Sequence, residues 1–106
     1  MAKYLIEASY TSEGAKGLLK DGGTKRRQAA EQALKTAGAK LEAFYFAFGQ
    51  PDAYVIVDAP DHATVAAASV AINASGAVKT RTIVLLTPEE IDQATKKNVT
   101  YTAPGH

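Results

Sequence analysis

The chain has 106 residues, which is the size of one domain with a single hydrophobic core. Its 12 Lys and Arg against 11 Asp and Glu leave a net charge of +1, so no broad cationic field exists to hold a nucleic acid. The chain has no Cys, which excludes disulfides, thiolate metal ligands and a Cys nucleophile. No signal-like or membrane-spanning apolar stretch precedes the first strand pattern, so we expect a cytoplasmic protein without membrane association.

The first half of the chain predicts a strand followed by two helices. Apolar residues at period two indicate a strand over residues 3–10. Thr11 or Ser12 can cap a short helix that a pair of glycines then ends. Thr24 is placed to cap a second helix that runs to about Ala37 along an apolar stripe.

The second half predicts a hairpin, a helix, a strand and a short terminal helix. The hairpin strands, the alanine-rich helix and the fourth strand are expected over residues 40–48, 53–58, 61–75 and 78–86. The terminal helix begins with a capping box, in which Thr87 caps, Pro88 takes the first helical position and Glu90 reaches back. We divide the chain into a domain over residues 1–95 and an extended tail over residues 96–106.

This order of elements is that of an α+β domain of the ferredoxin-like βαββαβ type with an extra C-terminal helix. All helices, the terminal one included, should then cover one face of a four-stranded antiparallel sheet. The second and third strands are apolar in both registers, although a face that meets water should be polar. We therefore expect the sheet to pair with another subunit as a homo-oligomer, at least a dimer, that encloses a barrel cavity.

Several motifs in this order resemble the GYD-domain family, and the resemblance covers nearly the whole chain. They are Ala8-Ser9-Tyr10-Thr11, Glu13-Gly14, Gly22-Gly23, Phe44-Tyr45-Phe46-Ala47-Phe48-Gly49, Tyr54-Val55-Ile56-Val57-Asp58 and Leu85-Leu86-Thr87-Pro88-Glu89-Glu90. The resemblance implies a dimeric α/β barrel, a fold also used by cofactor-free monooxygenases, haem-degrading enzymes and muconolactone isomerase. It implies no particular activity. The family's Gly-Tyr-Asp element falls at the hairpin, where Pro51 replaces the Tyr, so no role of that Tyr transfers.

The start of the second helix is a candidate site for a ligand carboxylate or phosphate. The candidate ligand-binding residues there are Gly23, Thr24, Arg26 and Arg27. Glycines free backbone N–H groups for an anion, and basic side chains in a first turn oppose the helix dipole unless an anion is present. Both arginines are expected to lean toward the sheet. The alternative is structural, with Arg27 paired to Glu31 and Arg26 paired to Asp21 or Glu7.

Glu7 and Arg81 are the candidate catalytic residues, because both are charged within strands. If the register places both on the partner-facing side, Glu7 would lie in an apolar cavity where a carboxylate can act as a general base. The alternative is an ordinary cross-strand pair or an edge-strand charge that prevents aggregation.

The aromatic side chains are a third group of candidates. Hydroxyls of Tyr10, Tyr45 and Tyr54 could orient a planar apolar ligand in a pocket shared with Phe44, Phe46 and Phe48. The alternative is that these residues form core and oligomer interface. His62 is expected on the polar, exposed side of its helix, and no metal site or cofactor is expected from two His and scattered carboxylates.

These features favour an oligomeric small-molecule-binding or accessory protein with an apolar, aromatic-lined cavity and an apolar or anionic ligand. A cofactor-free enzyme of the isomerase or monooxygenase kind and a purely structural assembly unit are the alternatives, because the fold alone does not separate them.

Overall fold

The computed structural model describes residues 2–106 and contains the elements in the predicted order. The strands are β1 Ala2–Tyr10, β2 Lys40–Phe46, β3 Ala53–Ala59 and β4 Val78–Leu85. The helices are α1 Ser12–Asp21, α2 Gly23–Ala37, α3 His62–Ala74 and α4 Pro88–Thr95. The strands form one antiparallel sheet in the order β2-β3-β1-β4, which confirms the α+β, ferredoxin-like fold.

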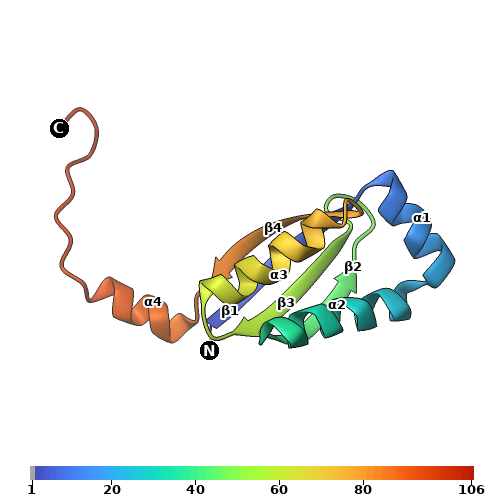
Figure 1. The fold of residues 1–106 in the computed structure, drawn as a ribbon. Helices are drawn as coiled ribbons and strands as arrows, with labels where there is room; N and C mark the ends of the chain where they lie inside the picture. The colour runs from blue at the N-terminus through green and yellow to red at the C-terminus, as the bar shows by residue number, and fades with distance from the viewer. Residues whose placement is uncertain (1) are drawn as a thin grey trace.

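Helices α2 and α3 lie side by side over one face of the sheet (Figure 1). Tyr4 and Ile6 of β1 point toward these helices and are buried, whereas their chain neighbours on β1 are only partly covered. The core between sheet and helices is centred on Tyr4, Leu34 and Val57, each almost inaccessible to solvent. The other face of the sheet carries no helix within residues 2–106, and we call it the open face.

The helix caps follow the sequence prediction at α1 and α4 and differ from it at α2. The Thr11 hydroxyl caps α1 by accepting from the Gly14 N–H at 3.2 Å, and the capping box of α4 forms as predicted. The prediction that Thr24 caps α2 is wrong, because α2 already begins at Gly23. Gly22, at φ +82°, makes the whole connection from α1, which leaves Thr24 inside the first turn.

The prediction that the terminal helix covers the sheet is also wrong. Helix α4 and residues 96–106 lead away from the sheet as an arm, and none of the helix residues is buried (Figure 1). Ile91 is the large apolar side chain of α4, and one such residue does not make the stripe that a covering helix needs. Within the described residues, no helix is long and apolar enough to span a bilayer.

Candidate functional site

The open face has an apolar centre that crosses all four strands. The register places Leu5 of β1 opposite Ile56 of β3 on one side and Ile83 of β4 on the other, and Ala43 of β2 lies opposite Ile56. We call these four residues the apolar strip. All of them are only partly covered by the chain itself, although their side chains are of the kind that fills a core.

A β-bulge in β2 decides which aromatic residues reach the open face. The register shifts between Leu41 and Ala43, so an extra residue, Glu42, separates the two halves of the strand. Leu41 and Phe44 therefore pack on the helix-covered core, and Tyr45 comes to the open face opposite Tyr54. Neither of the two simple registers read from the sequence describes β2 alone.

The predicted aromatic pocket is consequently divided. Tyr45 and Tyr54 lie on the open face, whereas Tyr10 and Phe44 pack against a helix-side cluster. Phe46 makes an edge-to-face contact with Phe44 on that covered side, with ring centroids 5.1 Å apart. Phe48 lies beyond the end of β2 and is fully exposed. One ligand cannot contact all of these rings within a single subunit.

A polar cleft lies at the hairpin end of the open face. Its volume is about 460 Å³, and its lining includes Glu7, Ser9, Pro51, Tyr54, Lys79 and Arg81. Tyr54 and Arg81 flank Glu7 on the neighbouring strands, so the open face brings the two candidate catalytic residues together with one of the candidate tyrosines. We call this the Glu7 cleft.

The charges of the Glu7 cleft are not balanced within the chain. Glu7 Oε1 lies 3.8 Å from Arg81 Nε, which is a long ion pair and not a hydrogen bond. The Glu7 side chain is 20% exposed and that of Arg81 is 81% exposed, so the guanidinium keeps donors available to a ligand. Lys79 adds a second cation, and the cleft therefore has a net positive charge that suits an anionic group.

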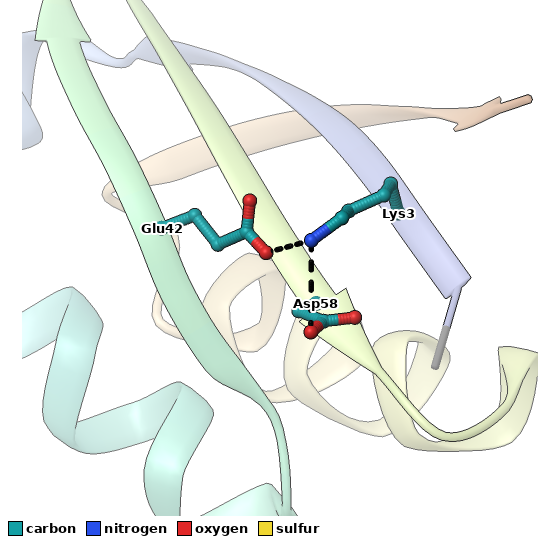
Figure 2. Close-up of polar contacts among 3 residues, drawn as sticks. All are labelled: Lys3, Glu42 and Asp58. Carbon is teal, nitrogen blue, oxygen red and sulfur yellow. Dashed lines mark hydrogen bonds and ion pairs between the residues drawn. The ribbon is translucent and has the colours of Figure 1, made fainter. Parts of the chain in front are cut away.

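The opposite end of the open face is internally paired. Lys3 Nζ donates to Glu42 Oε1 and lies 3.7 Å from Asp58 Oδ2, which links β1, β2 and β3 (Figure 2). The hydrogen bond to Glu42, followed by the charge of Asp58, raises the pKa of Lys3 above its ordinary 10.5. Because two carboxylates already neutralise this ammonium, it has less positive charge available for a ligand than the Glu7 cleft has.

The residues predicted to bind an anion at the start of α2 do not form one site. Gly23, Thr24 and Arg27 open onto a shallow depression beside Phe46, whereas Arg26 points to a different pocket between α1 and the sheet. Successive helical residues are about 100° apart, so only one of two adjacent arginines can face the sheet. The expectation that both lean toward the sheet is wrong for Arg27, which is exposed.

The ion pairs expected for these arginines as the structural alternative are also not found among the described residues. Asp21 lies 3.8 Å from Lys25, one turn along the helix. Within residues 2–106, neither Arg26 nor Arg27 has a carboxylate within 4.0 Å. The two arginines therefore keep unneutralised guanidinium groups.

One polar contact of the core escaped the sequence reasoning. The hydroxyl of the buried Tyr4 lies 2.6 Å from Nδ1 of His62, and the two rings meet edge to face. His62 is exposed, as expected, but it also satisfies the Tyr4 hydroxyl. The sequence held one signal for this contact: a Tyr at a buried strand position needs a hydrogen-bond partner for its hydroxyl. The described residues contain no cluster of His, Asp and Glu that could hold a metal ion.

The protein is thus a ferredoxin-like domain with an apolar open face and a charged cleft at one end of that face. The GYD domain matches residues 4–95, most of the chain, and the protein belongs to this family. No curated protein and no solved structure gives a significant match. The evidence for the function of this protein is therefore the geometry of its open face.

Proposed function

We propose that the protein is a homo-oligomer, at least a dimer, that binds a small amphipathic molecule between two open faces. The observation that carries this proposal is the apolar strip, which adjoins the unbalanced charges of the Glu7 cleft. Burial of apolar surface contributes about 25 cal/mol per Å², so a face of this composition is stabilised by a cover. A second copy supplies a matching sheet.

The terminal arm supports association for a separate reason. Helix α4 spans only Pro88–Thr95, and an isolated helix of this length is unstable in water. Its Ile91 and the tail residues Val99 and Tyr101 are exposed. Packing of the arm on another copy would cover these side chains and stabilise the helix.

The proposed ligand has an apolar body and one anionic group. The body would lie on Leu5, Ile56 and Ile83, while Arg81 and Lys79 would bind a carboxylate or a similar anion. The hydroxyl of Tyr54 is placed to orient the molecule between these two parts. The cysteine-free composition fits a reducing compartment, and we place the protein in the cytoplasm.

Cofactor-free catalysis is the second candidate function, and the position of Glu7 favours it over a purely structural role. Its side chain is already four-fifths covered within one subunit and adjoins the surface proposed for the ligand. A second sheet would exclude more water from this carboxylate, which is the environment of a general base. Such a base would abstract a proton from the bound molecule and return it elsewhere, as in an isomerisation.

Binding can be tested by thermal shift and calorimetry with a panel of aromatic and aliphatic carboxylates. We expect a hit whose affinity falls about tenfold or more in Arg81→Ala, because a charge-assisted hydrogen bond is lost. Arg27→Ala is the matched control, since Arg27 lies away from the open face, and it should bind normally. Equal weakening by both substitutions, or no stabilisation by any panel member, contradicts the proposal. Glu7→Gln then separates the two functions, because it should stop turnover without stopping binding.

A further inference from the structure

A second pocket lies on the helix side of the sheet, away from the open face. It occupies about 330 Å³ between α1, the start of α2 and the ends of β1 and β4. Its lining includes Tyr10, Glu13, Gly17, Leu18, Asp21 and Arg26. We call it the α1 pocket, and its volume is within the range of small-ligand sites.

Arg26 is the first indication that the α1 pocket takes a ligand. Its position on α2 shares a face with the buried Ala30 and Leu34, so its side chain runs against the sheet. Its Nε is buried and has no hydrogen-bond partner among the described residues. A buried donor without an acceptor is unfavourable, and a guanidinium without a carboxylate more so. An anion bound to the guanidinium at this pocket would supply the missing counter-charge.

Gly17 is a second and independent indication. Apart from its chain neighbours and the backbone of α1, a Cβ at Gly17 would meet none of the described atoms within 4 Å, and its backbone is ordinary helix, so neither packing nor conformation requires glycine there. Glycine is a poor helix former, so a helix-interior glycine without such a reason is unexpected. Gly14 gives the contrast, because its Cβ would lie 2.0 Å from the Ala77 carbonyl oxygen. Gly17 is exposed, and the space over it is open at the edge of the pocket.

The carboxylates of the pocket restrict the kind of ligand. Glu13 and Asp21 line the same pocket as Arg26, and among the described residues only Asp21 of these two has a cation within 4.0 Å, namely Lys25 at 3.8 Å. A simple anion would gain from Arg26 but would be repelled by these carboxylates. A ligand with an anionic group for Arg26 and an ammonium group for Glu13 meets both requirements, and Leu18 and Gly17 leave room for a short apolar body.

We propose that the α1 pocket binds a small zwitterion of the amino-acid type, with its carboxylate on Arg26, its ammonium toward Glu13 and its side chain over Gly17. This site is separate from the open face and does not depend on the function proposed there. Arg27 provides an internal reference, because it is the same residue type at the adjacent position and lines a different depression.

The test uses the full chain, isotope-labelled for NMR, and three probes at millimolar concentration. The probes are phenylalanine, 3-phenylpropionate, which lacks the ammonium, and phenethylamine, which lacks the carboxylate. We expect phenylalanine to shift the amides of Gly14, Gly17 and Arg26 and to leave those of Glu7 and Arg81 unchanged. Each truncated probe should bind the α1 pocket about tenfold or more weakly, as followed at the Gly14, Gly17 and Arg26 amides, because one charged contact is missing.

Substitutions then assign the contacts. Arg26→Met keeps the apolar stem of the side chain and should weaken phenylalanine binding about tenfold or more, while Arg27→Met stays near wild type. Gly17→Leu should abolish binding by filling the pocket, and Gly17→Ala serves as the helix-propensity control. If Arg26→Met does not fold, Gly17→Leu and the truncated probes still decide. Equal effects of the two arginine substitutions, equal binding of all three probes, or unshifted pocket amides overturn the proposal.

Discussion

The two faces of the sheet are built from similar apolar residues at their centres and differ in what covers them. Val57 of β3 is fully buried beneath the helices, and its chain neighbour Ile56, equally apolar, lies partly exposed on the open face. Along one strand, alternate side chains point to opposite faces, so the strand is apolar on both. Within residues 2–106, only one face has helices to cover it. The covered face therefore stabilises the subunit, and the uncovered apolar centre of the open face supports the proposal that this face associates with another copy and binds a ligand.

The largest expected effect is the loss of a core side chain on the covered face. Leu34→Ala should lower the free energy of unfolding by about 2–5 kcal/mol, because it removes buried methyl groups and leaves a cavity under α2. Urea denaturation at fixed protein concentration measures this loss. Leu19→Ala is the control, since Leu19 is 89% exposed and should change stability little. Similar losses in both variants would contradict the assignment of the core.

An intermediate effect is expected at the cap that positions α1. Thr11→Ala should lower the free energy of unfolding by about 0.5–2 kcal/mol, because Thr11 accepts from the Gly14 N–H and donates to the Gly76 carbonyl. Thr24→Ala should change it by only a few tenths of a kcal/mol, since Thr24 lies inside α2 and makes no capping bond. Thermal unfolding of the two variants measures the difference. A larger loss of stability in Thr24→Ala than in Thr11→Ala would show that Thr24 does cap α2.

The smallest effect concerns the paired end of the open face and depends on pH. The contacts of Lys3 with Glu42 and Asp58 raise its pKa above 10.5, so their stabilisation is complete below that pH. It is then lost as the pH rises through the raised pKa of Lys3. Unfolding followed from about pH 9 upward should therefore show a decline that Lys3→Met lacks. Identical pH profiles for wild type and Lys3→Met would show that the contacts contribute nothing.

Local sequence signals predicted the order of the elements, and long-range geometry decided the sites. The Thr87 capping box depends only on neighbouring residues and formed as predicted, and the left-handed Gly38 that ends α2 is a feature of the same local kind. The bulge at Glu42 has no local signature, although it sets which aromatic residues face the helices. The separation of Arg26 from Arg27 follows from helix phase, but the pocket that Arg26 reaches requires the placement of α1.

The pairing of Glu7 with Arg81 also depended on long-range geometry that the sequence does not give. Strand alternation placed each residue on one of two faces, and only the register of β1 with β4 put them opposite each other. The direction of α4 was not predictable from its cap, because a cap fixes where a helix begins and not what it packs on. Within residues 2–106, α4 has no buried residue, and this supports the proposal that the arm packs on another copy.

The central claim, that the open face is covered by another copy, is tested most directly by the mass of the protein in solution. Light scattering after size exclusion, at micromolar concentration, should give at least twice the subunit mass of 11.1 kDa for the wild type. Ile56→Glu should give folded monomers, because it places a charge in the centre of the apolar strip. Val70→Glu, on the exposed side of α3, should keep the wild-type mass. A monomeric wild type, or an Ile56→Glu variant of unchanged mass, would contradict the account.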